Sequence, residues 1–341
     1  MHNQMVRVKK VLQYVAFFLL FPIAAFGQNT YIADVEDFLV DMLVISNKYV
    51  SPAAEAAVYQ STGSWYSSAK SLELFELDVS FHVNALPVSN SQKSFTVRDT
   101  DFISLKIRDA TSAEVPTALG GDTDVFYDFS LNGEAYELQT FEGATQKVFY
   151  YPYLQGSIGL WKQTELTLQY VPEIKIDASG YKTFGGAIKH NISQYWHGSD
   201  ADDTAIQIAV QVAYSLFDSK IFIDDFEISP TNPEEPALAV INSLAVDADA
   251  VTLQFIGSKR YRSFEFVGAF AMSANQFDYT MDGEGAFFLS LLNEAFTALE
   301  DTSTMMRGNV GVNYHMNNWY LASNVTIGKF INTNFSIHYK L

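Results

Sequence analysis

The 341-residue chain has no cysteine, few charged residues and, after residue 30, no long hydrophobic run. The absence of cysteine excludes disulfide bonds, thiolate catalysis and cysteine-based metal sites. Charged residues make up 18% of the chain, whereas about a quarter is usual for a soluble domain. A membrane helix needs roughly 18 or more consecutive apolar residues, which no segment after residue 30 supplies. These deficits argue against an ordinary soluble domain and against a helical membrane protein.

Basic residues are scarcer still, with 21 Lys and Arg against 39 Asp and Glu, a net charge of −18. This balance opposes nucleic-acid binding, which needs a basic surface. The six histidines are scattered, so we predict no metal site and no cofactor. Asp200, Asp202 and Asp203 lack the glycine and the distal glutamate of a calcium-binding loop, which favours a solvated loop at 197–204 over an ion site.

The N-terminus has the three parts of a secretory signal peptide. Arg7, Lys9 and Lys10 form a basic start, residues 11–26 are apolar, and Ala25-Phe26-Gly27 is a small-x-small cleavage site. We predict a signal peptide over residues 1–27, cleaved after Gly27, rather than a retained anchor. Losing the three basic residues takes the net charge from −18 to −21.

What the chain does have is apolar residues, 48% of the total, arranged in alternation. Residues 75–85 alternate strictly, as a β-strand with two different faces requires. One face is predicted to contact lipid: Phe75, Leu77, Val79, Phe81 and Val83. The other is predicted to face a barrel lumen: Glu76, Asp78, Ser80, His82 and Asn84. The same alternation fits a soluble β-sandwich, so this strand alone does not identify the solvent.

Further strands repeat the pattern, and the last one ends the chain. Alternation is clear at 166–176, 206–216, 251–255 and 264–270, with Pro172 predicting a bulge or a free edge. Phe335, Ile337, Tyr339 and Leu341 form the apolar face of the final strand. Such a strand resembles the terminal signal that the outer-membrane insertion machinery reads. We therefore predict an all-β, transmembrane antiparallel β-barrel over residues 71–341, in preference to a soluble, periplasmic or secreted β protein.

The connections between strands are of two kinds, as in outer-membrane barrels with short turns on one side and long loops on the other. Residues 177–180 form a tight turn, whereas 110–128, 197–204, 218–236 and 272–286 are expected to be long polar loops. Residues 287–300 fit either a short amphipathic helix in an extracellular loop or one more strand and hairpin.

Residues 28–70 precede the barrel and begin with helical periodicity over 31–45. The apolar stripe consists of Val35, Phe38, Leu39, Met42 and Leu43. We expect Pro52 to end this helix and residues 53–70 to connect it to the first strand. The stripe favours a plug that enters the barrel from the periplasmic side and lines a pocket; the alternative is a periplasmic cap helix.

Three stretches resemble a Bacteroidota outer-membrane family without an assigned activity, related in shape to the long-chain fatty-acid channels. They are residues 63–70 leading into 75–85, residues 166–176, and residues 184–196. Ser67 and Ser68 stand where that family has asparagine and threonine. The resemblance implies a barrel of about 14 strands, an even number, with a short N-terminal plug.

Function is less constrained than fold. His82 and Asp78 lie four residues apart on one strand, too far for a direct hydrogen bond, so we expect His82 to be a lumen polar group and the protein not to be an enzyme. The first hypothesis is a passive channel for small hydrophobic molecules, gated by the N-terminal segment. The second is a non-transporting scaffold that binds another outer-membrane or secretion component. A channel should have an apolar pocket between plug and wall, and a scaffold a filled lumen.

The predicted cleavage site and cellular location can be tested on the mature protein. We expect N-terminal sequencing to begin at Gln28 and the folded protein to fractionate with the cell outer membrane, in contact with its lipid. Recovery of folded protein from the periplasm without detergent would contradict this assignment.

Overall fold

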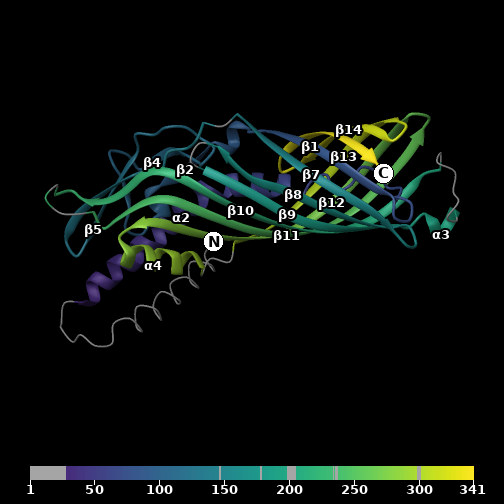
Figure 1. The fold of residues 1–341 in the computed structure, drawn as a ribbon. Helices are drawn as coiled ribbons and strands as arrows, with labels where there is room; N and C mark the ends of the chain where they lie inside the picture. Colours follow the sequence, from purple (N-terminus) through teal and green to yellow (C-terminus); the bar gives the residue numbers. More distant parts are fainter. Residues whose placement is uncertain are drawn as a thin grey trace.

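The computed structural model describes residues 28–145, 147–176, 179–197, 205–232, 234, 237–297 and 301–341. Within these residues, ten antiparallel strands form a ring, which closes where the first pairs with the last (Figure 1). In spatial order the ring strands are β1 (Leu77–Pro87), β7 (Val148–Leu160), β8 (Thr164–Ile176), β9 (Ser179–Asn191), β10 (Gln207–Pro230), β11 (Ala239–Tyr261), β12 (Phe264–Glu284), β13 (Asp301–Met316), β14 (Trp319–Gly328) and β15 (Ile331–Lys340). The predicted signal peptide lies outside the described residues.

The predicted class, an all-β antiparallel barrel with an even number of strands, is confirmed, but the ring has ten strands within the described residues rather than about 14. Three of the ten, β10, β11 and β12, are very long, with 24, 23 and 21 residues. The expectation of long loops at 218–236 and 272–286 is wrong, because β10 continues to Pro230 and β12 to Glu284.

Shorter elements lie between β1 and β7. They are the 3-10 turns η1 (Asn90–Gln92) and η2 (Asp99–Asp101) and the strands β2 (Ser94–Arg98), β3 (Lys106–Ile107), β4 (Ser112–Pro116), β5 (Phe126–Leu131) and β6 (Glu134–Gln139). The β5–β6 hairpin pairs with the far end of β10. The 110–128 stretch predicted as a loop therefore includes β4 and the start of β5.

The two ends of the barrel differ. One end carries the tight turns at 161–163, 262–263 and 317–318, the helix α3 (Gln194–His197) and the C-terminus. We call it the turn mouth. At the other end β10, β11 and β12 run on beyond the shorter strands, and β2–β6 and two helices gather around them (Figure 1). We use the name cap for the assembly of these strand ends with residues 28–58, residues 88–145 and α4 (Ala286–Thr297).

The outer surface of the ring is apolar, which is the surface that lipid requires. Phe266, Phe270 and Met272 are exposed on β12, and every ring strand carries similar outward side chains. Exposed aromatic residues collect at the turn mouth, as in an interfacial aromatic girdle: Trp161, Tyr195, Trp196, Tyr261 and Trp319. Among the described residues, none of the helices has the length and apolar character that a bilayer crossing requires.

The outward face of the long strands becomes polar as they enter the cap. On β12 the exposed positions change from Phe270 and Met272 to Gln276, Asp278 and Thr280, while the inward positions of the same stretch become Phe277, Tyr279 and Met281. A strand with lipid on one side would not place aspartate there. The change therefore marks the end of the lipid-facing band and the start of the cap.

Helix α2 (Gln28–Ser61) supplies the centre of the cap core. Phe38 stacks on Phe129 of β5, with ring centroids 4.3 Å apart, and also contacts Phe288 of α4. Asp41 is fully buried, and its carboxylate accepts main-chain hydrogen bonds from residues 103–105. These hydrogen bonds compensate the desolvation of its charge.

The predicted plug residues lie in this core. Phe38, Leu39, Met42 and Leu43 are buried, and Val35 is partly buried against them. The cavity beside α2 has a volume of only about 10 Å³. Such a space holds at most one water, and none of these five side chains lines it; they pack in the cap core.

The prediction that Pro52 ends the helix is wrong, because α2 continues for nine residues to Ser61. Proline removes one main-chain donor from a helix. Beside it, the Ser51 hydroxyl donates to the carbonyl of Asn47 at 2.7 Å. Tertiary packing then decides the outcome, because Val50, Ala54 and Val58 are buried on either side of the proline.

Two local predictions agree with the structure. The β8–β9 register shifts between Val171 and Ile174, which confirms a bulge at Pro172. Residues 286–297 form the helix α4 rather than another hairpin, with one face packed on α2 and β12.

The boundary of the lipid band can be tested on one face of β12. We expect Phe270→Arg to lower the free energy of unfolding in lipid by about 2–4 kcal/mol, because a charge is placed in the hydrocarbon. Thr280→Arg, on the same face within the cap, should change it by less than about 1 kcal/mol. Equal costs in reversible urea unfolding would show that the membrane boundary is misplaced.

Candidate functional site: the occupied lumen

The barrel interior is occupied by the chain itself, through residues 59–72, which we call the lumen segment. At its start the Tyr59 hydroxyl donates to the carbonyl of Phe330, in the β14–β15 turn beside the cap, at 3.0 Å. Near its end the Ser71 hydroxyl donates to the carbonyl of Gln163, in a tight turn at the turn mouth, at 2.7 Å. The lumen segment therefore crosses the barrel from the cap to the turn mouth.

The residues predicted to face the lumen lie as follows. Asp78, Ser80, His82 and Asn84 are buried inside the ring, whereas Leu77, Val79 and Phe81 are exposed on its outer surface. Glu76 is half-buried at the turn mouth, 3.7 Å from the ammonium of Lys340. Asn84 reaches the lumen segment, since its amide donates to the carbonyl of Gln60 at 3.4 Å.

Side chains of the wall bind chiefly the main chain of the lumen segment. The carbonyl groups of this segment accept hydrogen bonds from amide, ammonium and guanidinium groups on β9, β10 and β13. The pairs are Gln211 to Trp65 (3.1 Å), Asn313 to Ser67 (2.7 Å), Lys189 to Ser68 (3.0 Å) and Lys70 (3.4 Å), Asn191 to Ala69 (3.1 Å), and Arg307 to Tyr59 (3.2 Å) and Thr62. Two main-chain amides, of Ala69 and Leu72, donate to Ser258 and Glu165, each at 3.2 Å.

Arg307 of β13 binds where α2 ends. Its guanidinium donates to the Tyr59 carbonyl, to the Thr62 carbonyl and to the Thr62 hydroxyl, and it lies 5.3 Å from the centre of the Tyr59 ring. The last carbonyl groups of a helix have no partner within the helix and carry partial negative charge. The arginine satisfies them, so one buried side chain ends the helix and fixes the start of the lumen segment.

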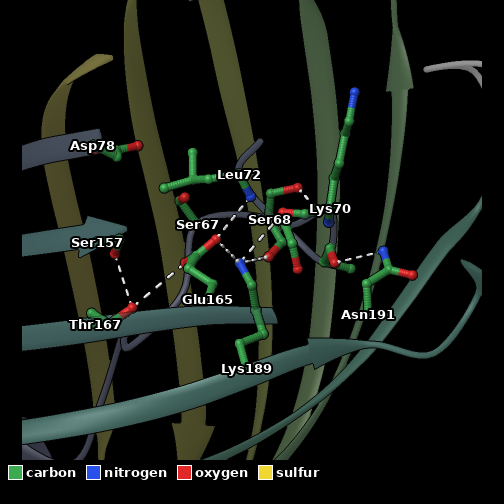
Figure 2. A network of polar contacts seen from close by, with 12 residues as sticks. Ser67, Ser68, Lys70, Leu72, Asp78, Ser157, Glu165, Thr167, Lys189 and Asn191 are labelled. Carbon is green, nitrogen blue, oxygen red and sulfur yellow. Dashed lines mark hydrogen bonds and ion pairs between the residues drawn. The ribbon is translucent and has the colours of Figure 1, made fainter. Parts of the chain in front are cut away.

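Lys189 and Glu165 form a buried ion pair beside the end of the lumen segment (Figure 2). The two charged groups are 2.9 Å apart, and their side chains are 1% and 7% exposed. Both also bind the lumen segment: Lys189 donates to its carbonyl groups, and Glu165 accepts from the amide of Leu72. Removing either partner would leave a buried charge uncompensated.

Trp65 is the main side-chain anchor of the lumen segment. Its ring is fully buried and packs into a notch formed by Gly185, Ala187 and Ala213. A side chain at Gly185 would place its Cβ 2.6 Å from the indole ring. The close approach of Trp65 explains why the first residue of the pair at 185–186 is glycine.

A polar cavity of about 120 Å³ lies between the lumen segment and the wall at the turn mouth. It is lined by both acidic and basic groups, among them the ion pairs Lys189–Glu165 and Lys340–Glu76. His315 lies 3.0 Å from Glu265, which also accepts a hydrogen bond from Ser68 of the lumen segment at 2.5 Å. Among the described residues, the apolar space between the predicted plug helix and the wall is only the cavity of about 10 Å³, and the larger space, at the turn mouth, is polar.

The strands that close the ring carry the same pattern in opposite directions: Asp78-Val-Ser-Phe-His82 in β1 and Asn334-Phe-Ser-Ile-His338 in β15. Each histidine bonds the serine of its own strand at 2.9 Å. Each also reaches across the seam, His338 to Asp78 at 3.0 Å and His82 to Asn334 at 3.4 Å. We call these six side chains the seam cluster. Both copies of the pattern can be read in the sequence. Only the antiparallel pairing of β1 and β15 shows that each histidine contacts the first residue of the pattern on the opposite strand.

The seam cluster includes a Ser336, His338 and Asp78 line with the spacing of a catalytic triad. Ser336 is buried and is not among the residues that line the turn-mouth cavity, so a substrate carbonyl in that cavity would not meet its hydroxyl. The geometry therefore fits seam closure better than nucleophilic attack. Within the described residues no group of three or more His, Asp or Glu side chains could hold a metal, and the acidic stretch at 200–203 lies outside them.

Comparison with known proteins gives a family but no activity. Residues 8–341 match a family of unknown function, DUF6588. No curated protein matches the chain. Among solved structures, the translocator domain of the autotransporter NalP from Neisseria meningitidis matches with a TM-score of 0.31 and 8% identity, over 88% of this chain and 97% of that one. The outer membrane channel DcaP of Acinetobacter baumannii matches with a TM-score of 0.22 and 10% identity, over 81% and 100%.

The notch for Trp65 can be tested with adjacent glycines. Gly185→Ala should lower the free energy of unfolding by about 1–3 kcal/mol, because the new methyl group overlaps both the indole ring and the β10 backbone. Gly186→Ala, whose Cβ would have its first neighbour 3.4 Å away, should change stability by less than about 0.5 kcal/mol. Heat-modifiable gel mobility and urea unfolding measure both; equal stabilities would show that Trp65 does not occupy the notch.

Proposed function

Because the chain belongs to DUF6588, a family of unknown function, its role has to be argued from its geometry, and we propose that it is a closed outer-membrane barrel that anchors the cap. In this proposal the lumen segment seals the barrel, and the cap is the part that meets a partner. This is the scaffold hypothesis with its partner-binding side named. The two-part architecture, an apolar ring continued by a folded polar-surfaced cap, supports it.

The observation that carries the proposal is the occupancy of the lumen. Side chains from β1 and from every strand from β8 to β14 bind residues 59–72. A neutral hydrogen bond contributes about 1 kcal/mol and one to a charged group about 1.5–3 kcal/mol. The sum of so many contacts favours a segment that stays in the lumen of the intact chain over one that leaves readily.

The orientation follows from the usual arrangement of such barrels, with short turns in the periplasm and long connections outside. On this assignment the turn mouth faces the periplasm and the cap faces the cell exterior. Residues 31–50 would then lie on the outer side, contrary to our expectation that they enter from the periplasm. Deleting residues 30–50 would remove the centre of the cap core rather than open the lumen.

A gated channel is the second candidate, and the turn-mouth cavity favours it. Its polar lining suits small polar solutes better than the small hydrophobic molecules expected from the sequence. The likeness to Bacteroidota proteins and to fatty-acid channels stays a prediction, as does recognition of β15 by the insertion machinery.

Conductance separates the two candidates. We expect the unmodified protein in planar bilayers to carry no steady ion current, because the lumen segment fills the ring. A steady current would contradict the closed barrel. The double variant Trp65→Ala, Gln211→Ala removes an anchor and a main-chain contact, and the matched variant Val212→Ala changes only the outer face of β10. Frequent openings in the first and none in the second would favour the gated channel.

A further inference from the structure

The contacts inside the barrel have the chemistry of peptide recognition rather than of side-chain packing. Gln211, Asn313 and Asn191 each donate a side-chain amide to a main-chain carbonyl, and Lys189 donates to two. Main-chain groups are common to all sequences. A wall that binds carbonyl groups therefore recognises an extended polypeptide with little regard to its side chains, as in peptide binding by main-chain hydrogen bonds.

The same wall has further hydrogen-bond acceptors that are unpaired in the part of the chain that the structure describes. The side-chain carbonyls of Gln155, Gln169, Gln211, Gln254 and Asn309 are buried and have no hydrogen-bond donor within the described residues. Buried polar groups are normally paired, because leaving one unpaired costs about 1–3 kcal/mol. These oxygens, on β7, β8, β10, β11 and β13, are suited to accept main-chain N–H groups of an inserted chain.

The side-chain requirements of the site are few. The lumen segment offers two adjacent aromatic anchors, Trp65 in the notch at Gly185 and Tyr66 against Ala209, Ile256 and Val267, and small residues at Gly63, Ser64 and Ala69. The fit thus specifies an extended chain of mostly small residues with two adjacent aromatic side chains.

We propose that the lumen wall is a binding site for an extended polypeptide segment, that residues 59–72 are its resident occupant, and that another segment of this chemistry can take their place. The inference rests on the closed barrel of the proposed function and names the ligand class of its lumen. The resident segment leads into the exposed residues Leu74 and Phe75 at the turn mouth, so a cut there would free one end while α2 stays in the cap.

The test uses the full chain with a protease recognition sequence inserted between Glu73 and Leu74, and with Trp65→Ala to weaken the resident. The probe is a fluorescent peptide with the native sequence of residues 59–72. After cleavage we expect saturable binding by fluorescence anisotropy. A peptide with its other residues rearranged around the fixed aromatic residues should bind within about threefold, and one lacking both the tryptophan and the tyrosine beside it at least about tenfold more weakly.

Variants of the wall provide matched controls. Gln211→Ala with Asn313→Ala should weaken peptide binding by about tenfold or more, because two hydrogen bonds of about 1 kcal/mol each are lost. Val212→Ala with Val312→Ala, on the outer faces of the same strands, should leave it unchanged. Absence of saturable binding to the cleaved protein, or equal effects of both pairs, would overturn the proposal. Conductance of the uncleaved protein would instead contradict the closed barrel on which it rests.

Discussion

Every polar main-chain group that enters a barrel lumen must find a partner there, and this constraint organises the interior of the protein. Residues 62–72 lack the internal hydrogen bonds of a helix, so their carbonyls depend on the wall. Side chains of the wall supply amide, ammonium and guanidinium donors from several strands. The inner face of the wall is polar because it must pair these carbonyls, and not because it contacts bulk water. The segment and the lining of the barrel are therefore complementary, and neither could change its register alone.

The second organising feature is unequal strand length. A ring of strands of similar length would end at the membrane surface, whereas β10, β11 and β12 continue and offer an apolar inner face without a matching wall opposite. Helix α2, the β5–β6 hairpin and α4 cover that face. Tyr49 shows how the cover is fixed: its hydroxyl donates to the carbonyl of Glu142 at 2.7 Å, and burial together with Glu142 raises the pKa of Tyr49 to about 12, so that it remains a donor.

Local sequence patterns were sufficient to predict which face of β1 is buried and which class of fold the chain adopts. Alternation in β1 identified which side chains are buried, and Pro172 marked a bulge, because both depend on neighbours in the chain. The extents of β10 and β12 were missed because their cap ends alternate with exposed aspartates, which in isolation indicate a loop. The occupant of the lumen was missed because residues 59–72 have no periodicity. Their fit is recorded in distant residues, such as Gly185 and Arg307, that only the ring brings near.

The seam cluster has a consequence for the order and the reversal of folding. Asp78 and His338 are separated by 260 residues in the chain, and His82 and Asn334 by 252. Contacts at such separation form only after the intervening strands have aligned, since loop closure opposes them until then. Interactions absent from the folding transition state hardly accelerate folding, but they slow unfolding. The contacts of His82 and His338 across the seam thus slow the unfolding of the assembled ring and do not accelerate its formation.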